Sequence, residues 1–183
     1  HLFSSAASDV YKRQTLISFE DRMSSKVLNG FFVNGSLDSL RLIGRASTTY
    51  HLFEDSLYKG KNLASGDTII MRFDERDRDA LVVDGGSQGE YVPNKKTNDS
   101  DFPLIYSADR IDYFLKTETT KLIGNAKAKH ENTDLKAGFI EVNWPTRILN
   151  AFPKQPHDSI NQFIKPTIIA VSYTHLRAHE TNV

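Results

Sequence analysis

The chain has 183 residues, with 23 basic and 23 acidic side chains and no cysteine. This balance gives no basic face of the kind that binds nucleic acid, and the lack of cysteine excludes disulfides and thiolate metal sites. No apolar run is long enough for a membrane-spanning helix, while the length is sufficient for a domain with a buried core.

Both ends of the chain resemble translated sequencing adapters. The matching segments are residues 4–14 and residues 171–181. We therefore predict that residues 1–14 and 170–183 are non-native additions and exclude them from the fold. This exclusion removes an apparent metal site, because His175 and His179 would share one face of a helix beside Glu180.

Between the ends, apolar residues recur with a period of two. The alternation runs through residues 40–52, 68–73, 111–115 and 122–129, and it is typical of β-strands that place one face on a core and the other toward water. The pattern predicts an all-β domain of many short antiparallel strands.

Glycine, asparagine and charged residues predict the connections between these strands. We expect turns at residues 34–36, 59–62 and 85–89 and a charged connection at residues 74–79. The polar residues 94–101 are expected to link two halves of the chain. Beyond Pro153, residues 154–162 are expected to form an exposed loop.

One unit occurs twice. Residues 42–46 (Leu-Ile-Gly-Arg-Ala) recur as residues 122–126 (Leu-Ile-Gly-Asn-Ala), and each copy precedes a strand that ends on an aromatic residue, at residues 66–73 and 137–144. Three positions correspond between these later strands: Ile69 with Ile140, Met71 with Val142 and Phe73 with Trp144. Such recurrence suggests stacked β units and not a single catalytic pocket.

Three short motifs follow one another in the second half of the chain. They are Ala108-Asp109 before Ile111, then Gly124-Asn125, then Ala137-Gly138. Their order resembles the OstA-like (organic solvent tolerance) family of lipopolysaccharide-transport proteins, although Gly138 stands where that family more often has Asp, and Phe152 where a glycine often follows the last Ala. A more divergent copy precedes it, so we predict OstA-like repeats at residues 15–97 and 98–169.

The resemblance implies an antiparallel β-jellyroll, open at both ends and located in the periplasm, with association with the outer membrane as a further option. It also implies that an apolar groove holds the acyl chains of lipid A, that no cofactor is needed, and that the partners are lipopolysaccharide and other jellyroll proteins stacked edge to edge. The groove candidates are Ile69, Met71, Phe73, Ile111, Tyr113, Leu115, Ile140, Val142 and Trp144. Basic residues proposed to lie at the groove mouth are Arg41, Arg45, Lys127 and Lys129.

Other interpretations remain open from the sequence. The groove candidates would equally form the core of any β-sandwich. No nucleophile is paired with a base, and residues 74–79 lack the glycine and distal glutamate of an EF-hand loop, so we predict neither an enzyme nor a metal protein. A β-solenoid or adhesin-like scaffold without lipid is the main alternative function. A carbohydrate-active β-sandwich would need a pair of catalytic carboxylates that no pattern indicates.

Overall fold

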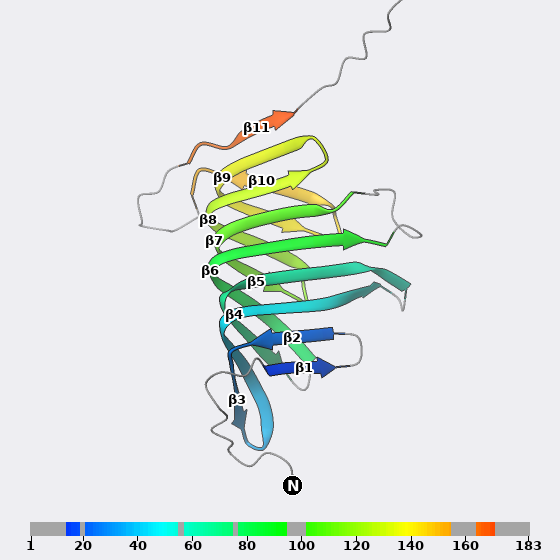
Figure 1. Cartoon of the computed structure of the whole chain (residues 1–183). Helices are drawn as coiled ribbons and strands as arrows, with labels where there is room; N and C mark the ends of the chain where they lie inside the picture. The colour runs from blue at the N-terminus through cyan, green and yellow to red at the C-terminus, as the bar shows by residue number, and fades with distance from the viewer. Residues whose placement is uncertain are drawn as a thin grey trace, which may run out of the picture.

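The computed structural model describes residues 14–18, 21–54, 57–74, 77–94, 102–154 and 164–170. Strands make up the ordered elements of these ranges (Figure 1). They are β1 (Gln14–Ser18), β2 (Asp21–Ser25), β3 (Val27–Val33), β4 (Ser36–Glu54), β5 (Leu57–Asp74), β6 (Asp77–Pro93), β7 (Leu104–Phe114), β8 (Thr119–His130), β9 (Thr133–Asn143), β10 (Ile148–Phe152) and β11 (Thr167–Ala170). The adapter-like ends lie almost wholly outside the described residues, as do most of the predicted linker at 94–101 and of the loop at 154–162.

All strands belong to one antiparallel sheet in the order β1-β2-β4-β5-β6-β7-β8-β9-β10, with β3 also paired to β4 and β11 also paired to β9. Within the described ranges the first strands do not pair with the last, so the sheet is not closed. Figure 1 shows the strands stacked one above another, from β1 and β3 at one end to β11 at the other. The predicted fold class, an antiparallel β-jellyroll open at both ends, is confirmed.

Each long strand bends near its middle. Pairing of neighbouring strands is interrupted between Ile43 and Ala46, between Ser65 and Thr68, between Asp84 and Ser87, between Ser107 and Arg110 and between Ile123 and Ala126. These interruptions form a corner that divides the sheet into two walls. Wing A consists of β3, β10 and residues 36–43, 68–74, 77–84, 110–114, 119–123 and 139–143. Wing B consists of β1, β2, β11 and residues 46–54, 57–65, 87–93, 104–108, 126–130 and 133–137.

The corner uses left-handed backbone in alternate strands. Gly44 has φ 80°, Gly85 φ 79° and Gly124 φ 75°, and the residue after each also has a positive φ. Glycine adopts this conformation without the steric penalty that a Cβ brings. In β4, β6 and β8 the bend takes two residues out of the ladder, so side-chain alternation keeps its phase across the corner. In β5, β7 and β9 the inward positions instead shift by one residue at the corner, from Ala64 to Ile69, from Ala108 to Ile111 and from Ala137 to Ile140.

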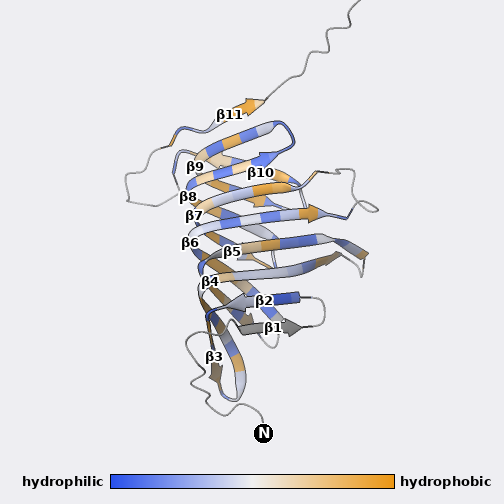
Figure 2. Cartoon of the chain, viewed as in Figure 1, coloured by the Kyte–Doolittle hydropathy of each residue, from blue (hydrophilic) through white to orange (hydrophobic). Residues whose placement is uncertain are grey.

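The alternation in the structure follows the predicted one. Leu40 and Leu42 before the corner, and Ala46, Thr48 and Tyr50 after it, are all buried. The same mixing of hydrophilic and hydrophobic positions is visible along the stacked strands in Figure 2. The buried side chains form one contiguous core between the wings.

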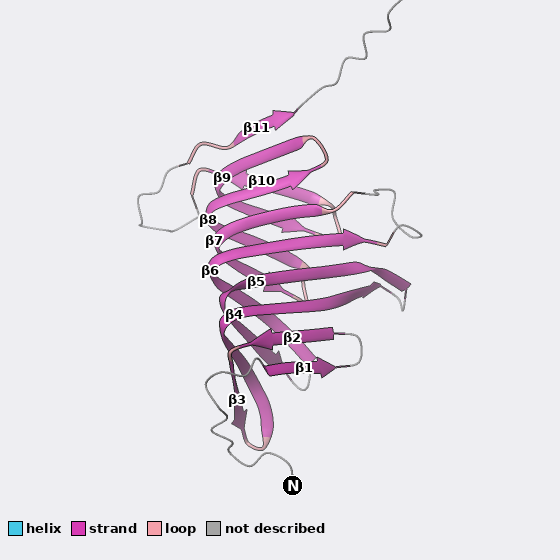
Figure 3. Cartoon of the chain, in the orientation of Figure 1, coloured by secondary structure: helices cyan, strands magenta, loops and turns pink. Residues whose placement is uncertain are grey.

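Two of the predicted turns are wrong. Residues 59–62 lie inside β5 and residues 85–89 lie inside β6, where Gly85 and Gly86 make the corner bend (Figure 3). The turn at residues 34–36 is confirmed, since Asn34 and Gly35 connect β3 to β4 with φ values of 49° and 80°. The charged connection is also confirmed, because β5 ends at Asp74 and β6 begins at Asp77.

Candidate functional site

The inner face of wing A carries two rows of side chains that run across the strands. The tip-side row consists of Leu40, Met71, Leu81, Tyr113, Thr120 and Val142, on β4 to β9 in turn. The corner-side row consists of Leu42, Ile69, Val83, Ile111, Leu122 and Ile140. Each of these side chains is at most 7% exposed. Wing A therefore presents an almost wholly apolar wall to the interior.

The structure brings the predicted groove residues together on this wall. Six of them, Ile69, Met71, Ile111, Tyr113, Ile140 and Val142, belong to the two rows. The other three, Phe73, Leu115 and Trp144, are partly buried at the wing A tips and pack against the same core. In this state the rows are packed and not lined by open space, so their contact with lipid remains a prediction.

The facing wall, on wing B, is made of smaller side chains. Its central row consists of Thr48, Ala64, Gly89, Tyr106, Ala128 and Leu135. Nearer the corner, the alanines at positions 46, 108, 126 and 137 are at most 7% exposed. Tyr106 is thus the one aromatic side chain in a row of small and aliphatic ones.

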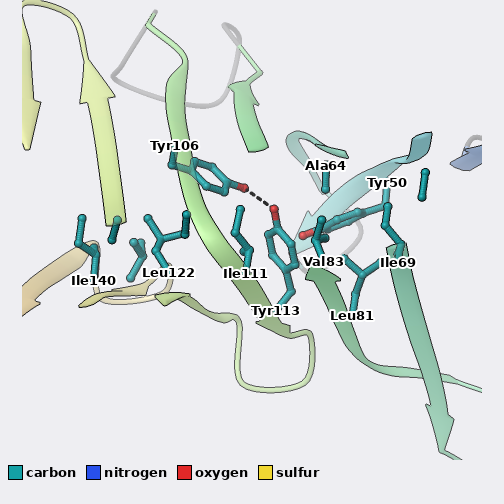
Figure 4. Packing of buried hydrophobic residues seen from close by; sticks show 14 of the residues in the cluster. Tyr50, Ala64, Ile69, Leu81, Val83, Tyr106, Ile111, Tyr113, Leu122 and Ile140 are labelled. Carbon is teal, nitrogen blue, oxygen red and sulfur yellow. Dashed lines mark hydrogen bonds between the residues drawn. The ribbon is translucent and has the colours of Figure 1, made fainter. Parts of the chain in front are cut away.

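A hydrogen-bonded chain crosses the interior at the height of β7. This strand supplies Tyr113 from wing A and Tyr106 from wing B, and the Tyr113 hydroxyl donates to the Tyr106 hydroxyl over 3.2 Å (Figure 4). Tyr106 donates to Asn62 Oδ1 at 2.7 Å, and Asn62 Nδ2 donates to the Tyr50 hydroxyl at 2.9 Å. All four side chains are at most 4% exposed. We call them the tyrosine chain.

Burial fixes the protonation state of these tyrosines. Desolvation raises the pKa of Tyr50, Tyr106 and Tyr113 above the ordinary value, because a buried phenolate loses its hydration. The hydroxyls therefore stay neutral and remain available as donors. Gly89 makes room for the chain, since a Cβ there would lie 2.1 Å from Tyr106 Cε2 and 2.7 Å from the Tyr113 hydroxyl.

Further contacts join the wings at their tips. The rings of Tyr91 on wing B and Trp144, directly after the wing A part of β9, lie 5.0 Å apart between centroids. Asp21 of β2 accepts a hydrogen bond from Arg78 of wing A and another from the backbone of His51 at 2.8 Å. Because the Asp21 side chain is only 12% exposed, water screens this ion pair less than a surface pair. The tips are thus held by non-covalent ties that can separate.

The basic residues that we expected near a groove mouth lie on outer surfaces. Arg41, Lys127 and Lys129 are exposed and alternate with buried neighbours, which places them on the outer faces. Arg45 is exposed at the corner, the side of the roll opposite the tips. Arg41 also borders an open surface hollow of about 640 Å³ near the end of β3. The placement of these four residues at the mouth is therefore not supported.

Sequence reasoning missed Tyr50, Asn62 and Tyr106. Alternation indicates that Tyr50 faces inward, whereas Asn62 was expected in the turn at residues 59–62 and Tyr106 lies outside the alternating runs. No local pattern shows which polar groups meet. A tyrosine and an asparagine at inward positions are the only available signal, because a buried polar group has to find a partner.

In the described ranges no three His, Asp or Glu side chains gather closely enough to hold a metal ion. No helix in the same ranges has the length and apolar character needed to cross a bilayer.

Comparison with known proteins supports the fold. No family model matches the sequence, and no curated protein matches it. Among solved structures, the chain is similar to the crystal structure of LptH from Pseudomonas aeruginosa, described as the LptA homologous periplasmic component of the conserved lipopolysaccharide transport device. The TM-score is 0.63 at 15% sequence identity, over 84% of this chain and 95% of that chain. A likeness at this identity establishes a shared fold.

Proposed function

We propose that this chain is a non-enzymatic, periplasmic component of lipopolysaccharide transport that holds the acyl chains of lipid A between its two wings. The observation that carries the proposal is the pair of inward rows on wing A, which continue across every strand from β4 to β9 in a roll with unsealed ends. The likeness to LptH adds support from a protein whose description names the same transport device.

The hydrophobic effect alone can provide useful affinity for such a ligand. Each buried methylene contributes about 0.8 kcal/mol, so an acyl chain with ten buried methylenes gains roughly 8 kcal/mol before ordering costs. No dedicated polar site is required. Since the rows are packed without ligand, binding requires the wings to move apart at their tips. The contacts that must yield there are the Asp21–Arg78 pair and the Tyr91–Trp144 contact.

We further propose that other jellyroll subunits of the same kind add to the two ends of the roll. At one end, β3 exposes Phe31, Phe32 and Val33; at the other, β11 exposes Ile168 and Ile169. Terminal strands of an open sheet offer backbone groups for pairing with another chain. Such pairing would place the interiors of neighbouring subunits end to end.

A photo-crosslinking amino acid at Val142 tests the function. We expect it to form a covalent adduct with purified lipopolysaccharide, because Val142 faces the interior. The matched control is position 141, one residue away on the outer face, where we expect no adduct. A folded Val142 variant that forms no adduct would contradict the proposal.

The β-solenoid alternative is not favoured. Every strand pairing in the described ranges is antiparallel, whereas a β-helix stacks its coils in parallel. A lipid-free scaffold with the present fold is the outcome that a negative result at Val142 would indicate.

A further inference from the structure

The tyrosine chain crosses the interior that the proposed function assigns to acyl chains. We propose that Tyr106 and Tyr113 partition the interior, so that an acyl chain occupies the part between β7 and β10 and is kept out of the part between β4 and β6. This inference rests on the proposed function and adds where in the roll the lipid lies.

The register places both tyrosines at the same level of the roll. Tyr113 interrupts the tip-side row of wing A, two strands from Met71 on one side and two strands from Val142 on the other. Tyr106 stands in the facing row of wing B, between Gly89 and Ala128. Their hydroxyls meet across the interior at 3.2 Å, so one strand provides a tie from wall to wall.

Figure 4 shows the arrangement in space. The Tyr106–Tyr113 pair lies between Ile140 and Leu122 on one side and Ile69 and Tyr50 on the other. The ring of Tyr106 lies directly against the backbone of Gly89, where even a methyl group would not fit. The ring is therefore held firmly in place by packing and hydrogen bonding.

The polar groups continue from this tie toward β4 alone. Asn62 on β5 and Tyr50 on β4 extend the tyrosine chain in that direction. An acyl chain offers no donor or acceptor, so its entry there would leave buried hydroxyl and amide groups unpaired. On the β8 and β9 side, Leu122, Ile140 and Val142 present only carbon atoms. The one inward hydroxyl in that part of the two rows, on Thr120, already accepts from Trp144 Nε1 at 2.9 Å.

Met71 and Val142 lie at equal distances, two strands, on either side of Tyr113 in the tip-side row, and this symmetry gives a direct test. A photo-crosslinking amino acid is placed at Met71 in one protein and at Val142 in another, and each is irradiated with purified lipopolysaccharide. We expect the Val142 adduct to exceed the Met71 adduct by about tenfold. Equal yields would overturn the partition and leave the proposed function standing, while no adduct at either position would overturn both.

A second measurement on the unaltered protein avoids any folding defect from a bulky probe. The chain has two methionines and one tryptophan. Met23 on β2 and Met71 on β5 lie on the β4 side of the Tyr106–Tyr113 pair, and Trp144 follows β9. With a nitroxide-labelled fatty acid, we expect quenching of Trp144 fluorescence without paramagnetic broadening of the methionine methyl signals. Broadening of the Met71 methyl signal at the same fatty-acid concentrations that quench Trp144 fluorescence would overturn the partition.

Removal of the hydroxyls tests whether their polarity causes the exclusion. In the double variant Tyr106→Phe/Tyr113→Phe, we expect the Met71 adduct to rise about tenfold, equivalent to about 1.4 kcal/mol, with the Val142 adduct unchanged. The matched control is Tyr58→Phe, which removes a tyrosine hydroxyl near the tip of wing B and should leave both yields as they were. An unchanged Met71 yield in a folded double variant would overturn the proposal.

Discussion

Two threonines in the interior differ in whether their hydroxyl has a hydrogen-bond partner, and this difference decides their contribution to stability. Thr48 and Thr120 are 3% and 2% exposed, respectively. The Thr120 hydroxyl accepts a hydrogen bond from the Trp144 indole, whereas Thr48 Oγ1 has no partner among the described residues. A buried polar atom without a partner is destabilising, because it has lost water and gained nothing in exchange.

The same substitution should therefore have opposite effects at the two positions. We expect Thr48→Val to raise the free energy of unfolding by about 1 kcal/mol, because valine has the same shape and needs no hydrogen bond. Thr120→Val should lower it by about 1–2 kcal/mol, because the indole N–H loses its acceptor. Urea unfolding followed by circular dichroism measures both. A loss of stability in Thr48→Val would show that its hydroxyl is satisfied after all.

At the residue scale, the inward face could be predicted from the sequence and its polar contacts could not. Alternation correctly selected Ile69, Met71 and Ile140 for the interior, because a strand side chain has only two sides. The hydrogen bond between Tyr106 and Asn62 joins residues 44 positions apart. Its existence depends on how two walls are folded against each other, which a local pattern does not contain.

At the scale of the strand, the corner is the determining feature. The sequence signal for it is Gly44-Arg45, Gly85-Gly86 and Gly124-Asn125, which recur once in every second strand. Glycine pairs also mark hairpin turns, so residues 85–89 were predicted to end a strand. The alternation that continues in phase through each pair distinguishes a bent strand from two strands joined by a turn. The resulting strands are long: β4 has 19 residues and β5 has 18.

The corner at β8 also depends on its neighbour on β7. Asp109 lies over Gly124 and accepts hydrogen bonds from Asn125 Nδ2 at 2.9 and 3.2 Å. A Cβ at Gly124 would lie 2.4 Å from Asp109 Oδ2. Gly124 is therefore required both for its left-handed backbone and for the space above it.

Two glycine substitutions separate these requirements. Gly35→Ala in the β3–β4 turn meets nothing within 4 Å and should cost only the left-handed penalty, about 1 kcal/mol. Gly124→Ala should cost about 2–3 kcal/mol, because the clash adds to the same penalty. Urea denaturation measures both. Asp109→Ala in the Gly124→Ala background should recover part of the difference, and strict additivity of the two changes would contradict the proposed clash.

At the scale of the whole molecule, one bent sheet creates two walls and a single interior between them. The sequence pattern predicted an all-β domain of antiparallel strands, the family resemblance implied a jellyroll open at both ends, and the structure has that fold. The division into repeats at residues 15–97 and 98–169 remains a prediction. No sequence pattern indicates that the interior is unevenly polar, with the tyrosine chain on the β4 to β7 side and aliphatic side chains beyond it.

This uneven polarity makes the stability of the molecule sensitive to alkali. Desolvation by burial raises the pKa of the three phenols of the tyrosine chain in the folded state, while in the unfolded chain they ionise near pH 10. Above that pH the unfolded state releases protons that the folded state retains, so stability falls as pH rises. Below pH 10 this loss of stability is absent. Each of the three groups lowers the free energy of unfolding by about 1.4 kcal/mol per pH unit above that value.

We therefore expect the wild-type protein to unfold cooperatively in alkali, with Tyr50, Tyr106 and Tyr113 ionising only as it unfolds. Tyrosinate absorbance at 295 nm recorded beside circular dichroism should show an early phase from the tyrosines outside the tyrosine chain and a late phase that coincides with loss of structure. In Tyr106→Phe/Tyr113→Phe, two of the three groups are absent, so the dependence of stability on pH above 10 should fall to about one third of its wild-type slope. Ionisation of all tyrosines in one phase before any loss of structure would show that the interior admits water at the tyrosine chain, and a partition made of buried hydrogen bonds could not then exclude lipid.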